Sequence, residues 1–215
     1  MDDFLNRKSS DWQNSALLHY PPGAPHWHAY ILGYKEAADR LVQTVMSGQR
    51  GNDFLVYPIL FLYRHWVEIF IKSLILQAQA LSGIEPPPRS RRMTSQGRSE
   101  RAEGHNLEHL WNYLLKITPE IYPGFSRPDV EAVDRVVAVL AKHDLSGDAA
   151  RYPLDMAQNP TLNDLQEINL RILAEEMDAA LSGFYELEGA FDYEIELRSL
   201  TYEYYCQFTG DTGEY

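Results

Sequence analysis

The chain has 215 residues, of which 45% are hydrophobic and 12% aromatic, and this is ample material for one well-buried domain. Its formal net charge of -12 argues against a general polyanion binder, because nucleic-acid affinity depends largely on cations that neutralise phosphates. The single cysteine, Cys206, excludes an intramolecular disulfide.

The start of the chain and its apolar runs predict a cytoplasmic protein without a membrane segment. The first residues, "MDDFLNRKSSDW", lack the basic and then apolar layout of a signal peptide. The longest uncharged apolar run, residues 54–63, is about half of the length needed to cross a bilayer, and Arg64 ends it.

Apolar residues at helical spacing predict an all-α, single-domain helical bundle of about five helices. Residues 1–25 end in prolines and a glycine and are expected to form an irregular arm. A first helix is predicted over residues 26–48 and a second over 53–82. Because the second helix is apolar on most sides, we expect it to be the central helix of the bundle.

Residues 86–103 are expected to form a disordered, flexible loop within the bundle, which spans residues 26–187. The loop contains five arginines and a single large apolar residue, a methionine, so it cannot bury enough surface to become ordered. A third helix is predicted to begin at residue 104 and to be closed by Pro119. A fourth is predicted over residues 128–143.

The fifth helix is predicted to start near residue 160, where Thr161 and Asp164 resemble a capping box, and to extend to about residue 187. Residues 188–215 form an acidic, tyrosine-rich C-terminal segment, which is expected either to cover the core or to bind a basic partner. Within it, apolar and charged residues alternate in "YEIEL", a pattern that is typical of a short strand.

Four polar residues share one stripe of the central helix. At roughly 100° per residue, Arg64, His65, Glu68 and Lys72 fall within about 100° of one another. In one interpretation the stripe is a solvated edge with ion pairs between residues four apart. In the other it lines a cleft, in which Arg64 and Lys72 hold an anion and His65 transfers protons.

Three motifs, "YPILFLYRHWVEIFIKSLI", "GHNLEHLW" and "ARYPLD", resemble a pattern found in bacterial helical-bundle proteins of the HEPN superfamily, and the resemblance covers residues 53 to about 155. It implies a compact bundle of four or five helices that is often a homodimer. Many such proteins are metal-independent ribonucleases of toxin, antiphage-defence or RNA-processing systems. Others are noncatalytic binding partners. The implied partners are therefore RNA or a protein encoded nearby, and no cofactor is expected.

The nuclease motif of that family is an Arg, four to six residues, and then a His. Here Arg98 and His105, with six residues between them, fit this spacing, although Arg98 lies in the predicted loop and not on the helix with the histidine. The resemblance implies that His105 acts together with Arg64 or Arg98. With the polar stripe of the central helix added, the catalytic candidates are Arg64, His65, Glu68 and His105. The candidates for substrate binding are Lys72, Arg98 and Arg151.

In "ARYPLD", Pro153 favours an extended Tyr152, which places Arg151 on a loop between two helices. Either Tyr152 packs and Arg151 pairs with Glu68, or Arg151 joins the anion site.

A metalloenzyme is the third class considered, beside a ribonuclease and a noncatalytic interaction module. "HNLEH" has the spacing of an inverted zinc-protease signature, in which His105 and His109 would bind one zinc and Glu108 would act as general base. The sequence after this motif shows no evident third zinc ligand, so no metal is predicted.

Overall fold

The computed structural model describes residues 27–48, 52–83 and 103–209, together with residues 13, 15 and 16. The predictions for the N-terminal arm and for the loop at 86–103, including Arg98, therefore fall almost wholly outside the described residues.

Five α-helices make up most of the described chain, which confirms the all-α prediction. They are α1 (Trp27–Met46), α2 (Val56–Ser82), α3 (Leu107–Ile121), α4 (Glu131–His143) and α5 (Leu170–Thr209). Short 3₁₀ turns, η3 (Asn52–Leu55), η4 (Glu103–His105) and η5 (Arg127–Val130), precede α2, α3 and α4. The described residues contain no strand, apart from an isolated bridge between Leu154 and Pro160.

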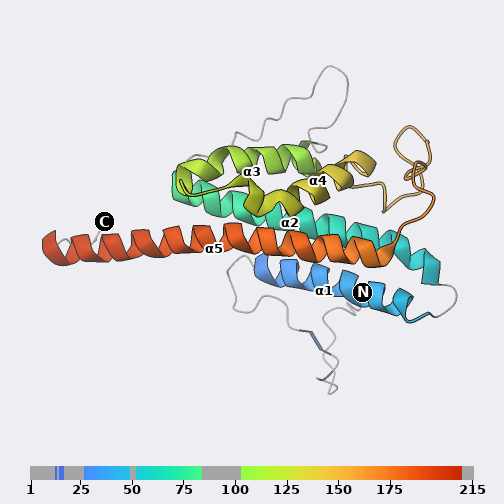
Figure 1. The fold of residues 1–215 in the computed structure, drawn as a ribbon, viewed down its shortest axis with the longest axis horizontal. Coiled ribbons are helices and arrows are strands. Elements are labelled where there is room, and N and C mark those ends of the chain that lie inside the picture. The colour runs from blue at the N-terminus through green and yellow to red at the C-terminus, as the bar shows by residue number, and fades with distance from the viewer. Residues whose placement is uncertain (1–12, 14, 17–26, 49–51, 84–102, 210–215) are drawn as a thin grey trace, which may run out of the picture.

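Helix α2 is the central helix, as its composition predicts. It packs against α1, α3 and α5, and Figure 1 shows α3 and α4 on one side of the bundle and α1 on the other. Trp66 and Phe70 of α2 are fully buried and meet Phe184 of α5, with the two phenylalanine ring centroids 4.5 Å apart. Gly83 ends the helix in a left-handed conformation (φ 65°), and its N–H bonds the Gln79 carbonyl.

The segment Asp53–Ser82 is long and apolar enough to cross a membrane by length and composition, with a mean hydropathy of 1.4 in its most apolar window. Half of that window is buried inside the bundle. Its central position in the core accounts for this apolar composition.

Two predicted helix boundaries are wrong. Pro119 does not close α3, which continues to Ile121, and the N–H of Tyr122 still bonds the Thr118 carbonyl. Helix α5 begins at Leu170, not near residue 160, because Asn169 is its N-terminal cap: the Asn169 side chain accepts hydrogen bonds from the N–H groups of Arg171 and Ile172.

The alternating "YEIEL" is not a strand, since α5 continues through it to Thr209. In Figure 1 this end of α5 projects beyond the other helices. Its exposed apolar side chains include Tyr193, Leu197 and Leu200, which are spaced four and three residues apart and so share one face of the helix. Helical spacing therefore continues into the acidic segment, beyond the predicted end at residue 187.

Candidate functional site

Arg64, Glu68 and Lys72 form a continuous ionic chain along α2. Their spacing of four residues places them one above another on the helix. Arg64 Nη1 donates to Glu68 Oε2, and Lys72 Nζ lies 2.6 Å from Glu68 Oε1. Arg64 and Glu68 are each only 3% exposed, so this part of the stripe is not a solvated edge.

The Arg64 guanidinium joins three parts of the fold. Nη2 donates to the backbone carbonyl of His105 in η4, and Nε lies 3.5 Å from Oδ2 of Asp144, the residue that follows α4. Arg64 thereby links α2 to the segment before α3 and to the end of α4.

Gly147 lies directly against this guanidinium. Its φ of +81° is in the left-handed region, and a Cβ at this position would lie 2.9 Å from Arg64 Cζ. Both the backbone angle and the available space therefore require glycine. The turn after α4 therefore packs so closely against Arg64 that a larger residue would not fit at position 147.

Lys72 and His105 converge on one oxygen of Glu68. His105 Nδ1 lies 2.7 Å from Glu68 Oε1, the same atom that accepts from Lys72. Burial raises the pKa of the Glu68 carboxyl, but Lys72, Arg64 and His105 together outweigh this effect and hold the pKa below its usual value. Glu68 is therefore an anion at neutral pH and accepts from Nδ1–H of His105, so Nε2 is the ring nitrogen that Glu68 does not contact.

Exposure differs along this chain of contacts. The His105 side chain is 49% exposed and that of Lys72 is 29% exposed, whereas Glu68 and Arg64 are buried. The arrangement is thus a buried carboxylate that orients a histidine and a lysine at the surface. Chemically it can transfer a proton through His105 beside the positive charge of Lys72.

His65 lies apart from these ionic contacts. Its ring meets Tyr34 edge-on at 4.5 Å between centroids and stacks on Phe61 at 5.7 Å. Burial lowers the pKa of His65, and the neighbouring charges of Arg64 and Lys72 lower it further, while Glu68 opposes them. The ring is therefore neutral at pH 7 and packs between two aromatic side chains.

The predicted pairing of Arg151 with Glu68 is wrong. Arg151 instead pairs with Asp148 at 3.2 Å and lies over the rings of Tyr152 and Phe61. Tyr152 is exposed and is not a buried plug. The carboxylates that neutralise Arg64 are Glu68 and Asp144. Neither of them pairs with Arg151, whose carboxylate partner is Asp148.

Asp144 is the site residue that sequence reasoning missed. A signal was present, because a carboxylate just after a helix meets the negative end of the helix dipole and needs a compensating cation or donor. The structure supplies both, with Arg64 on one side and the N–H of Ala149 donating to Oδ1 at 3.1 Å.

A second ionic group, centred on the buried Lys35, joins α1 to α5. Lys35 contacts Asp39 at 2.8 Å and Asp178 at 2.6 Å, and the Tyr63 hydroxyl donates to Asp39. Burial lowers the pKa of Lys35, but its hydrogen bonds to the two aspartates outweigh this and raise it overall. Burial, with Asp39, also raises the pKa of Tyr63. All four polar groups satisfy one another, so we assign this group to the scaffold.

The zinc alternative depends on His105 and His109. His105 precedes α3 in η4 with Nδ1 held by Glu68, while His109 is exposed on α3. Among the described residues, no three His, Cys, Asp or Glu side chains are grouped so that they could hold a metal ion.

Comparison with known proteins finds no matching family model, no matching curated protein and no matching solved structure.

Substitution of Arg64 by methionine should lower the free energy of unfolding by about 3 to 5 kcal/mol, because buried Asp144 would lose its cation and buried Glu68 would keep only Lys72 and His105. Urea denaturation measures the change. The matched control is Arg40→Met, which breaks an exposed pair with Glu36 and should cost less than about 1 kcal/mol. Equal effects of the two substitutions would contradict a buried role for Arg64.

Proposed function

We propose that this protein is a HEPN-like helical bundle that cleaves RNA without a metal ion. The observation that carries the proposal is the convergence of Lys72 and His105 on Glu68, with both side chains reaching the surface. Metal-independent RNA cleavage needs a base and a nearby cation, and these two side chains supply them.

In the proposed reaction, His105 Nε2 removes the proton from a ribose 2′-hydroxyl. The 2′-oxygen attacks the adjacent phosphorus, the bond from phosphorus to the 5′-oxygen breaks, and water supplies the proton to that oxygen. The products are a 2′,3′-cyclic phosphate and a 5′-hydroxyl. Lys72 lies where it can stabilise negative charge on the phosphoryl oxygens, and Glu68 orients the imidazole.

Arg64 is not a phosphate ligand in this proposal, because its guanidinium is buried among Glu68, Asp144 and the His105 carbonyl. We assign it instead to positioning, since the same Glu68 carboxylate that holds Arg64 also orients His105.

Replacement of His105 by alanine should reduce cleavage of a single-stranded RNA in EDTA by about 100-fold or more, the usual range for the loss of an acid–base group. The fold should survive, because Arg64 bonds the backbone carbonyl of His105 and not its ring. A quenched fluorescent RNA measures the rate, and a DNA of the same sequence should not be cut.

His109→Ala is the matched control, since this nearby histidine is exposed on α3 and should leave the rate unchanged. Cleavage by His105→Ala at the wild-type rate, or a wild-type protein that neither binds nor cleaves RNA, would overturn the nuclease proposal.

A noncatalytic interaction module is the second candidate, and the projecting end of α5 favours it. Tyr193, Leu197 and Leu200 are 44–62% exposed and are bordered by Glu194 and Glu196. Residues 186–204 contain one basic residue, Arg198, and it donates to the Leu81 carbonyl at the end of α2. The partner proposed for this face is therefore a basic amphipathic helix of another protein.

A synthetic helical peptide with leucines on one face and lysines beside them should bind the wild type, and its affinity should fall as salt rises. Leu197→Gln should weaken this binding, whereas Leu76→Gln, which removes an exposed leucine of α2, should not. Fluorescence anisotropy measures both. Equal binding of a peptide with glutamates in place of the lysines would contradict the proposal. If the wild type instead sediments as a dimer that Leu197→Gln dissociates, this face binds a second copy of the chain, as in the expected homodimer, and not another protein.

A further inference from the structure

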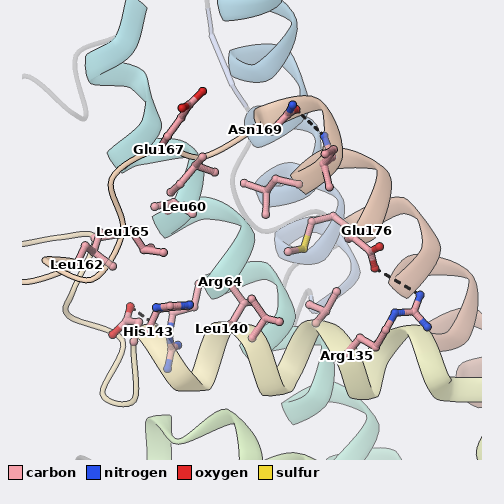
Figure 2. A pocket seen from close by; sticks show the side chains of 18 residues that line it. Leu60, Arg64, Arg135, Leu140, His143, Leu162, Leu165, Glu167, Asn169 and Glu176 are labelled. Atoms are coloured by element: carbon pink, nitrogen blue, oxygen red, sulfur yellow. Dashed lines mark hydrogen bonds and ion pairs between the residues drawn. The ribbon is translucent and has the colours of Figure 1, made fainter.

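An apolar pocket of about 470 Å³ lies among α2, α4, the first turns of α5 and the segment that joins α4 to α5. Its apolar wall includes Leu60 of α2, Leu140 of α4, Leu165 of the joining segment and Ile172 and Met177 of α5. Figure 2 shows Arg64 and His143 at one end and Arg135 with Glu176 at the other. The volume lies in the range of small-molecule sites.

Apart from Glu167, the charged groups around this pocket are paired with one another or with neighbouring residues. Arg135 pairs with Glu176 at 3.4 Å, and His143 with Asp164 at 2.7 Å. Asp144 is held by Arg64 and by the N–H of Ala149. Figure 2 shows the carboxylate of Glu167 pointing away from the other labelled side chains. A charged ligand would therefore find no unpaired counter-charge inside the pocket and would lose its hydration on entry.

The Arg64 guanidinium at one end of the pocket is engaged by the protein itself. Its Nε is buried and lies 3.5 Å from Asp144 Oδ2, and its two Nη atoms donate to Glu68 and to the His105 carbonyl. The pocket therefore favours apolar contacts over a hydrogen bond to this cation.

Parts of the apolar wall remain exposed. Val139 of α4 and Ile172 of α5 both line the pocket and are about half exposed. A ligand that covers these side chains would remove apolar surface from water.

From these observations we propose that the pocket binds a small, neutral, mostly apolar molecule, with its hydrocarbon body along Leu60, Leu140 and Met177. This site is separate from the surface formed by His105 and Lys72, and it does not depend on RNA cleavage.

The test uses Nile red, a neutral fluorescent dye with a carbonyl group, on the full chain. Its fluorescence should rise on binding. It should be displaced by 2-octanone at a concentration about tenfold or more below that needed for octanoate or octylamine, a difference that corresponds to about 1.4 kcal/mol. Both comparisons isolate charge, because the three molecules have chains of the same length.

Val139→Trp should fill the mouth of the pocket and weaken dye binding about tenfold or more, while the melting temperature stays near that of wild type because position 139 is exposed. Leu76→Trp, which introduces the same ring at an exposed position of α2 outside the pocket, should bind as wild type does. RNA cleavage should be unchanged in both variants.

Three results would overturn the inference: no dye binding by the wild type, unchanged binding by Val139→Trp, or displacement by octanoate or octylamine at least as effective as that by 2-octanone. None of these results bears on His105, so failure of this inference and failure of the nuclease proposal are distinguishable.

Discussion

The burial of the Arg64 guanidinium constrains the rest of this fold. A buried charge is tolerated when its charge and its donors are matched, and here the matching groups come from three separate parts of the chain: Glu68 one turn along α2, the His105 carbonyl in η4, and Asp144 after α4. The contact at Gly147 closes the remaining side. The position of α3, the end of α4 and the turn that follows are thus all fixed relative to one side chain of the central helix.

The same side chain separates the two surfaces to which we assign chemistry. On one side Arg64 holds Glu68, whose other oxygen orients His105 and Lys72 toward solvent. On the other side it lines the apolar pocket among α2, α4 and α5. Because the guanidinium is enclosed, it orients the groups around it and is not an exposed anion-binding charge. We therefore assign the proposed proton transfer to the half-exposed His105 and the proposed ligand binding to the largely apolar pocket.

Much of the fold could be predicted from the sequence, because apolar periodicity is local. The central helix and its ionic stripe follow from apolar periodicity and four-residue spacing. The contact of His105 with Glu68 does not follow from spacing, because 37 residues separate them, and His105 was a candidate only through the family resemblance. Contacts that depend on how distant turns fold back could not be predicted in this way. Asp144 reaches Arg64 through the turn at Gly147, and Arg151 of the same segment turns instead toward Asp148. The start of α5 was missed because Thr161 resembles a cap, whereas Asn169 makes the capping hydrogen bonds.

The most direct test of the central claim is the free energy of unfolding as a function of pH, measured by urea titration for the wild type and for Glu68→Gln. The pKa of Glu68 is depressed in the folded protein, so its contribution is fully present above its ordinary value and is lost as the pH falls through the lower, folded value. The account predicts a difference of about 3 to 5 kcal/mol between the two proteins at pH 7. It should shrink below about pH 4.3, as protonated Glu68 comes to resemble glutamine. A difference under about 1 kcal/mol at pH 7, or one that does not change with pH, would contradict a buried ionic network around Arg64.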